Sequence, residues 1–445
     1  GEHVGIHRQN VPQYAIAMLA LWKIGAAAVV LNPMYFGREL RMPVEDSGAV
    51  GIIATDADVP AIRDNVAGTR AGWILSTSER DLQTRNDPRA FAPGQTVDAS
   101  VDGDLMTVIS ENAGRSPEPV TISPDDLALL TYTSGTTGQP KGVQRDVGGY
   151  CVALASSIPL IFMGKPGETF FCTSDIGWVV GHSYIIYGPM IGGMATIMYE
   201  GTPLRPDAGI WWQIVEKYKV SVMLSAPTAA RVLKKQDPAY LSKYDLSSLR
   251  HLFLAGEPLD QPTHEWIMSA LKVPVIDNYW QTETGWPMMA AVRGVEDTPV
   301  KYGSPSFPVY GYDLRIFRED GSECGPNEKG IVGVVPPLPP GCLSTVWGQD
   351  ERFVSTYFSL FTNPVVYSSS DWGIKDEEGY HTILGRMDDV INVAGHRLGT
   401  REIEEAVQAH PAIAEVAVVG VQDELKGQMP MAFAVSRYAF QSASS

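Results

Sequence analysis

Leu130–Gly142 has the sequence Leu-Thr-Tyr-Thr-Ser-Gly-Thr-Thr-Gly-Gln-Pro-Lys-Gly, in which an apolar start gives way to glycines and hydroxyls and then to a lysine. This order predicts a buried strand that leads into a tight loop. Glycines let a backbone approach a ligand closely, consecutive backbone N–H groups can cradle an anion, and a lysine adds positive charge. The spacing differs from the GxxxxGK[ST] loop of nucleoside triphosphatases. We therefore interpret the segment as a phosphate-binding loop, with a solvated turn as the alternative.

Strand and helix patterns alternate on both sides of this loop. Apolar residues recur at three- and four-residue steps over residues 14–24, which predicts a helix between strand-like runs at residues 2–6 and 26–31. Further apolar runs predict strands at residues 51–54, 127–133, 195–199, 220–225, 252–255 and 273–276. A helical stretch is predicted among them, at residues 210–219. The alternation predicts an α/β fold with a mostly parallel sheet. Residues 79–122 are polar, with scattered Gly, Pro and Ser and little periodicity, so we predict a loop with one short helix there.

The composition limits the kind of partner. The chain has 445 residues, with 34 Lys and Arg against 51 Asp and Glu and a formal net charge of -17, which argues against nucleic acid or an anionic membrane as a partner. No run of about 18 apolar residues predicts a membrane-spanning helix, and neither end resembles a signal peptide. The four cysteines lie far apart, as is typical of a reducing compartment. We expect a fragment of a longer cytoplasmic protein, or of a mitochondrial-matrix protein if the source is eukaryotic.

Six segments together resemble the adenylate-forming acyl-CoA synthetases, the AMP-dependent synthetases and ligases. They are residues 132–142 (YTSGTTGQPKG), 144–150 (QRDVGGY), 174–184 (SDIGWVVGHSY), 277–286 (DNYWQTETGW), 337–342 (PLPPGC) and 395–405 (GHRLGTREIEE). The resemblance runs from about residue 127 to about residue 437. It is closest to the short-chain branch, which activates acetate and propionate, and within that branch to the propionate-activating enzymes.

This resemblance implies an ATP-dependent ligase. Its reaction would convert a short-chain carboxylate, propionate first, to an acyl-adenylate and then to an acyl-CoA, releasing pyrophosphate and AMP. Mg²⁺ is the implied cofactor, and the implied partners are the small molecules ATP, coenzyme A and the carboxylate, with no nucleic acid and no membrane. The alternatives are an acetyl-CoA synthetase, a medium-chain acyl-CoA synthetase, and a non-catalytic nucleotide-binding fragment.

The resemblance also implies a domain plan. A large N-terminal adenylating domain of layered α/β subdomains would occupy residues 1–387, with a β-rich subdomain at about residues 309–387. Residues 388–445 would form the start of a small, mobile α+β C-terminal domain, and we expect this domain to be truncated in the chain. We expect the family's C-terminal lysine, which promotes adenylation, to lie beyond Ser445.

Site residues follow from their positions in the family motifs. Thr133, Thr136, Lys141, Thr282, Glu283 and Arg397 are implied as catalytic, with Thr282 on the α-phosphate and Glu283 on Mg²⁺. Implied nucleotide-binding residues are Ser134, Gly135, Thr137, Gly138, Gly256, Glu257, Pro258, Asp277, Asn278, Tyr279, Gln281, Asp371 and Arg386, of which the last two hold the ribose. Gly395 is implied to contact coenzyme A, and Asp388 to be the hinge. From the residues alone, Glu283 would be a solvated carboxylate, and Arg386 and Asp388 would belong to a solvated charged turn.

The implied acyl pocket consists of Val179, Val180, Ala255 and Trp280. Trp280 matches the tryptophan that closes the pocket in short-chain members, where longer-chain members have a small residue. Acetate-activating members tend to have Val and Thr at the positions of Ala255 and Val180. The smaller Ala255 leaves room for roughly one more methylene, worth about 1–3 kcal/mol in discrimination, which favours propionate. The alternative is that Trp280 is a core aromatic with no role in substrate choice.

Overall fold

Parallel strands build most of the first sheet of the computed structural model, which describes residues 1–84, 102–133, 140–257, 259–387, 390–393, 396–408, 410, 412–423 and 427–436. Neighbouring strands from β6 through β5 are parallel, whereas β7 is antiparallel to both β6 and β17. In spatial order the strands are β17 (Thr345–Val346), β7 (Lys141–Asp146), β6 (Leu127–Thr133), β2 (Ala27–Leu31), β1 (His3–His7), β3 (Gly51–Thr55), β4 (Trp73–Thr77) and β5 (Gly103–Asp104).

The second sheet is also parallel through its centre. The run from β12 to β9 is parallel, and β13 and β14 extend the β12 side in antiparallel fashion. In spatial order the strands are β14 (Phe307–Pro308), β13 (Met289–Ala290), β12 (Val275–Tyr279), β11 (His251–Leu254), β10 (Val220–Ser225), β8 (Thr169–Cys172) and β9 (Ala195–Ile197).

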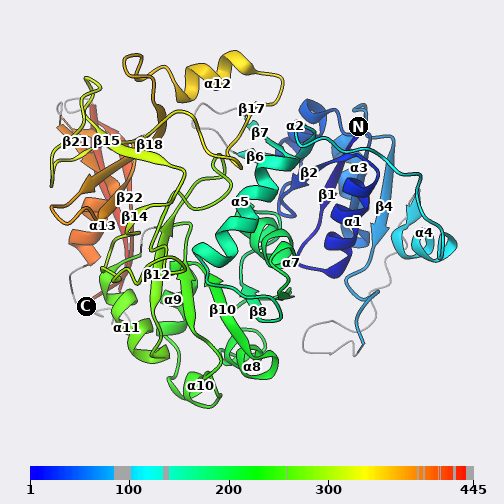
Figure 1. Cartoon of the computed structure of the whole chain (residues 1–445), viewed down its shortest axis with the longest axis horizontal. Coiled ribbons are helices and arrows are strands. Elements are labelled where there is room, and N and C mark those ends of the chain that lie inside the picture. The colour runs from blue at the N-terminus through cyan, green and yellow to red at the C-terminus, as the bar shows by residue number, and fades with distance from the viewer. Residues whose placement is uncertain are drawn as a thin grey trace, which may run out of the picture. The chain divides into compact units, whose positions relative to one another are not determined.

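Helices connect these strands, and α1 lies beside β1 and β2 (Figure 1). Local sequence fixes several of their starts, because an aspartate side chain accepts a hydrogen bond from the first turn of α4, α5 and α11. The helices are α1 (Pro12–Lys23), α2 (Arg38–Ser47), η1 (Asp56–Asp58), α3 (Val59–Val66), α4 (Leu105–Glu111), α5 (Val147–Leu160), α6 (Val179–Gly181), η2 (His182–Tyr187, π-helical), α7 (Gly188–Ile191), α8 (Ile210–Tyr218), α9 (Pro227–Lys234), α10 (Ala239–Ser242), α11 (Gln261–Leu271), α12 (Asp350–Tyr357) and α13 (Thr400–Gln408).

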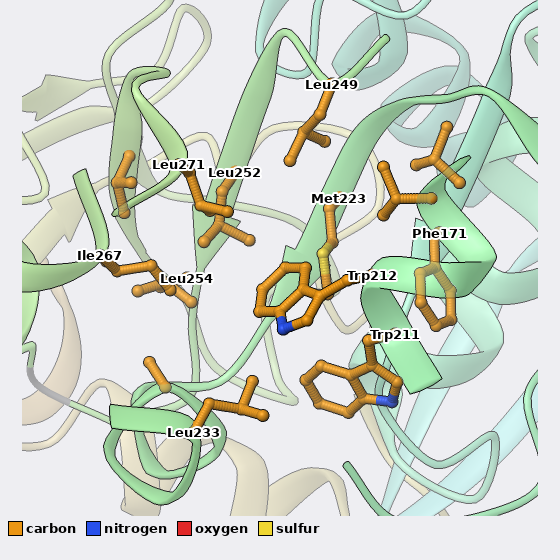
Figure 2. Packing of buried hydrophobic residues seen from close by; sticks show 14 of the residues in the cluster. Phe171, Trp211, Trp212, Met223, Leu233, Leu249, Leu252, Leu254, Ile267 and Leu271 are labelled. Atoms are coloured by element: carbon orange, nitrogen blue, oxygen red, sulfur yellow. The ribbon is translucent and has the colours of Figure 1, made fainter. Parts of the chain in front are cut away.

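The second sheet packs on its helices through a large apolar cluster. Figure 2 shows Trp211 and Trp212 of α8 close to Met223 of β10 and Phe171 of β8. Every residue of β10 is buried, as expected for a central parallel strand that is covered on both faces. A separate cluster gathers side chains of β2, β3 and β6 with α2 and α3. Each parallel sheet therefore has its own core.

The predicted α/β class is confirmed by these sheets. The helix predicted at residues 14–24 is α1, and the one predicted at residues 210–219 is α8. All the predicted strands form, although the strand expected at residues 273–276 begins two residues later and ends three residues later, at Val275–Tyr279. In the stretch expected to be a loop, the short helix is α4, and β5 adds a two-residue strand.

The chain divides into two compact units, Gly1–Tyr312 with Pro337–Thr356, and Asp313–Pro336 with Tyr357–Ser445. The second unit contains two antiparallel sheets. One has the order β15 (Asp313–Phe317), β16 (Gly330–Val335), β18 (Tyr367–Lys375) and β19 (His381–Arg386), and the other β21 (His396–Gly399), β20 (Val390–Val393), β23 (Gly427–Ser436) and β22 (Ile413–Asp423). The proposed hinge at Asp388 lies outside the described residues, so the boundary there stays a prediction.

Candidate nucleotide and acyl site

The predicted phosphate loop connects the antiparallel strands β6 and β7. Thr133 and Lys141 pair across the two strands, so the hairpin closes immediately on either side of the loop. Thr133 Oγ1 is buried and has no hydrogen-bond partner among the described residues, which leaves a hydroxyl available at the start of the loop. Five predicted residues, Ser134, Gly135, Thr136, Thr137 and Gly138, lie outside the described residues.

Lys141 faces the carboxylate of Glu283. Their Nζ and Oε1 atoms are 3.8 Å apart, and the two side chains are only 12% and 14% exposed. Glu283 lies just after β12, in a turn in which Thr284 Oγ1 accepts from the amide of Gln281 at 3.1 Å. The solvated surface carboxylate that the residues alone suggested is therefore wrong for Glu283. A lysine and a carboxylate together at the end of a strand can hold a polyphosphate and a hard cation.

Arg145 supports the same turn through a hydrogen bond to its backbone and was not among the predicted site residues. It is fully buried in β7 and donates to the backbone carbonyl of Thr282, and also to that of Gly341 at 3.3 Å. The amide of Leu343 donates to the Glu283 carbonyl at 2.7 Å. One signal in the sequence could have indicated Arg145, because strand alternation puts it on the same inward face as Val143.

The predicted adenine residues come from two adjacent strands. Leu254 of β11 pairs with Asp277 of β12, so Gly256 and Asn278 lie at the same, carboxyl edge of the sheet. Asn278 donates to the Leu254 carbonyl at 3.0 Å, and its Oδ1 is buried without a partner among the described residues. Open ends of parallel strands are where ligands bind in α/β sheets. An unpartnered buried acceptor at this edge suits an exocyclic amine such as that of adenine.

The loop after β11 bends at Gly256, whose φ of 99° strongly favours glycine. A Cβ built at Gly256 would have no atom within 4 Å, so the space next to this backbone is open. The carboxylate of Glu257 accepts from Arg231 Nη1 at 2.8 Å. Pro258 lies outside the described residues.

The predicted ribose pair belongs to the second unit. Asp371 of β18 and Arg386 of β19 are direct cross-strand partners. Asp371 is buried and its amide donates to Ser369 Oγ at 3.2 Å, whereas Arg386 is exposed, as a charged turn would place it. Arg397 lies in β21 opposite Asn392. Gly395 lies outside the described residues.

The predicted acyl pocket residues follow the carboxyl ends of three strands. Val179 and Val180 begin α6 after β8, whereas Ala255 and Trp280 directly follow the adjacent strands β11 and β12. Val179, Ala255 and Trp280 are buried. The ring of Trp280 meets Tyr184 of the π-helical turn η2 edge to face, with centroids 5.6 Å apart.

Three charged residues outside the predicted site, Arg8, Glu79 and Glu200, influence one another. Arg8 directly follows β1, at its carboxyl end. Arg8 is almost fully buried there and donates to Thr55 Oγ1 at 2.5 Å. Burial, reinforced by Glu79, raises the pKa of Glu200 to about 7, and Arg8 offsets only part of that rise. Glu200 therefore changes charge close to neutral pH.

The sequence pattern of the AMP-binding enzyme family matches residues 1–335. The chain belongs to the AMP-binding enzyme family. The pattern of the AMP-binding enzyme C-terminal domain matches residues 402–443, so both parts of an AMP-binding enzyme are represented. Among the residues that the structure describes, no helix combines the length and apolar character needed to cross a membrane.

Three relatives show which AMP-binding enzymes the chain is similar to. The propionate–CoA ligase of Escherichia coli is 51% identical over 98% of this chain and 70% of its own length. That of Salmonella typhimurium is 50% identical over the same shares. The acetyl-coenzyme A synthetase of Wolinella succinogenes is 36% identical over 99% of this chain and 68% of its own. Because the first match covers 98% of the chain, the similarity extends through the residues before position 127, beyond the range that the motifs indicated.

Proposed function

We propose that the protein activates propionate with ATP and transfers the propionyl group to coenzyme A. In the first step a propionate oxygen attacks the α-phosphorus, the bond to the β-phosphate oxygen breaks, and pyrophosphate leaves. In the second step the thiolate of coenzyme A attacks the acyl carbon and AMP leaves. The observation that carries this proposal is the 51% identity to a propionate–CoA ligase over 98% of the chain. The facing Lys141 and Glu283 support it, because they place charge where polyphosphate chemistry needs it.

The chain's own residues do electrostatic and positioning work in this proposal. Lys141 and the loop from Thr133 hold negative charge on the phosphates, and Thr282 contacts the α-phosphate. Adenylation needs no nucleophile from the protein, because the carboxylate of the substrate is the nucleophile. Glu283 would hold Mg²⁺, for which one carboxylate plus phosphate oxygens is a fitting set of ligands. When bound, the ion would neutralise part of the negative charge of the phosphates.

The nucleotide and coenzyme A contacts are proposed on the family positions. Adenine would lie against Gly256–Pro258 and Asp277–Tyr279, with Gln281 beside it, and the ribose hydroxyls would bind Asp371 and Arg386. We further propose that the C-terminal domain rotates about Asp388 between the two steps, bringing Arg397 to the phosphates in one state and Gly395 to coenzyme A in the other. All four cysteines are free thiols, which suits the proposed cytoplasmic location.

Acid choice is proposed to depend on Trp280, Ala255, Val179 and Val180. Trp280 would end the pocket, and the small Ala255 would admit one methylene more than acetate has. One methylene in an apolar pocket is worth about 1–3 kcal/mol, so we expect a preference rather than exclusion of acetate.

The test is an acid profile of the full-length protein. We expect ATP–pyrophosphate exchange and thioester formation to be most efficient with propionate, lower with acetate and butyrate, and absent with octanoate. Highest efficiency with acetate would identify an acetyl-CoA synthetase, and comparable efficiency with octanoate a medium-chain enzyme. ATP binding without exchange for any acid would indicate a non-catalytic nucleotide-binding protein.

A further inference from the structure

Arg231 of α9 links two acidic side chains beside the proposed adenine site. Its Nη1 donates to Glu257 Oε2 at 2.8 Å, and its Nε donates to Asp260 Oδ2 at 2.9 Å. The other oxygen of Glu257 accepts from the amide of Thr228 at 2.7 Å and also from the Thr228 hydroxyl. Both oxygens of the Glu257 carboxylate are therefore bound by α9.

The charges of this network support each other. Burial acts to raise the pKa of Glu257, but the hydrogen bonds from Thr228 and Arg231 outweigh it and hold that pKa below its ordinary value. For Arg231, burial acts to lower the pKa, and the bonds to Glu257 and Asp260 more than compensate. Hydrogen bonds between ionised partners are about twice as strong as neutral ones, so the network is a firm anchor.

The anchor turns the Glu257 side chain toward α9. The open space next to the loop lies over Gly256, where an added Cβ would meet nothing within 4 Å. A ring that enters this space would therefore meet the backbone of residues 255–257, and its fit would depend on how that backbone is held. The carboxylate of Glu257 is the group through which α9 holds this backbone in place.

We propose that Arg231 is a positioning residue for the adenine ring of ATP, acting through Glu257. The inference rests on the proposed function, because that function puts adenine at Gly256 and Glu257. Arg231 donates to the carboxylates of Glu257 and Asp260, so it would hold the loop through the Glu257 side chain. No predicted site residue lies on α9, so this role adds a third segment to the two strand ends that form the adenine side.

Asp260 provides a matched control. Its Oδ2 binds Arg231, whereas its Oδ1 accepts from the amide of Thr263 and caps α11. Asparagine is as good an N-cap as aspartate, so Asp260→Asn keeps the cap and removes only the second ion pair of Arg231. This variant leaves all three hydrogen bonds to the Glu257 carboxylate in place.

The experiment compares wild type, Arg231→Met and Asp260→Asn in the full-length protein. We expect Arg231→Met to raise KM for ATP and Ki for AMP by roughly tenfold, the size of effect that losing a charged hydrogen bond has on binding. KM for propionate and Ki for inorganic pyrophosphate should stay within about twofold, because neither molecule carries adenine. Asp260→Asn should stay within about twofold in all four constants.

A double-mutant cycle with Glu257→Gln tests whether Arg231 acts through Glu257. If it does, the double variant should bind AMP about as weakly as the weaker single variant, rather than showing the product of the two losses. Equal weakening of AMP and pyrophosphate, unchanged AMP binding in Arg231→Met, or fully additive losses would each overturn the inference. Failure of wild type to exchange pyrophosphate with any acid would instead overturn the proposed function.

Discussion

Lys141 and Glu283 come from different sheets, yet their charged atoms are 3.8 Å apart. Lys141 begins β7 of the first sheet, and Glu283 follows β12 of the second. A polyphosphate that binds Lys141 would compete with this carboxylate unless a cation joins the carboxylate to the phosphates. The short separation therefore favours a bridging cation in the proposed site, because such a cation would let the lysine and the carboxylate bind the same phosphates.

Lys141→Met should separate the two proposed half-reactions. Without its charge on the phosphates, acyl-adenylate formation should fall by roughly 100-fold, a typical loss for one electrostatic contact to a transition state. Thioester formation from supplied propionyl-adenylate should fall much less, because pyrophosphate has already left. Rapid-quench assays of each step would measure this. Equal losses in both steps would contradict the assigned role.

Glu283→Gln should change the dependence on Mg²⁺. An amide is a weaker ligand than a carboxylate for a hard cation, so the Mg²⁺ concentration for half-maximal exchange should rise by roughly tenfold. Chelation of Mg²⁺ should abolish exchange in wild type. Glu265→Gln, at an exposed glutamate of α11, is the control and should leave the Mg²⁺ titration unchanged. An unaltered titration in Glu283→Gln would remove Glu283 from the proposed metal site.

Trp280→Gly should admit longer acids. Removing the indole opens the end of the proposed pocket, so the ratio of kcat/KM for hexanoate to that for propionate should rise by at least roughly tenfold. Tyr184→Phe is the matched control, because it keeps the ring that meets Trp280 and removes only the hydroxyl that donates to Ser157 Oγ at 3.0 Å. If both variants keep the wild-type chain-length profile, Trp280 is a core aromatic only.

Asp371→Ala should reduce discrimination between ATP and 2′-deoxy-ATP. A buried carboxylate that accepts from a ribose hydroxyl favours the ribonucleotide by roughly tenfold or more, and the alanine variant has no such acceptor. Steady-state kcat/KM values for the two nucleotides would show the change. Asp320→Ala, at an exposed turn of the same unit, should discriminate as wild type does.

Glu200 should make the protein less stable as the pH rises toward neutrality. Its pKa is about 7 in the folded protein against 4.5 ordinarily, so between these values the folded state keeps a proton that the unfolded chain releases. The free energy of unfolding therefore falls as the pH rises through this window. Glu200→Gln should be more stable than wild type by on the order of 1 kcal/mol at about pH 8, with residual solvent screening taken into account. At about pH 4.5 the two should match, and an identical difference at both pH values would refute the assignment.

Much of the fold could be predicted because its central strands are continuous apolar runs. Val220–Ser225 is buried throughout, and the same buried character marks Ala27–Leu31. The turn of η2 could not be predicted in this way, since an apolar stretch such as His182–Tyr187 does not distinguish a π-helical from an α-helical hydrogen-bond pattern. The motifs indicated Lys141 and Glu283 as separate residues, and only the fold shows that they face each other.

The roles of two arginines could not be predicted from the sequence, for a physical reason. Arg145 and Arg231 act on backbone or side chains that belong to other segments, and a charged residue read alone suggests solvent exposure. The Arg145 partners are 137 and 196 residues away along the chain. Strand alternation indicates only that Arg145 faces inward, and nothing local in β7 or α9 indicates these partners, whereas the residues predicted for the glycine-rich loop lie within a few positions of one another.

The two bonds of Arg145 also tie the site to residues far along the chain. Contacts between distant residues carry a larger entropy of chain closure than local ones. The turn at Thr282 therefore has its full support only when β7 and the segment around Gly341 are both in place. During synthesis, the turn cannot acquire its final support until Gly341 has left the ribosome, so a nascent chain that still lacks this residue should carry the phosphate loop without a finished site for the nucleotide.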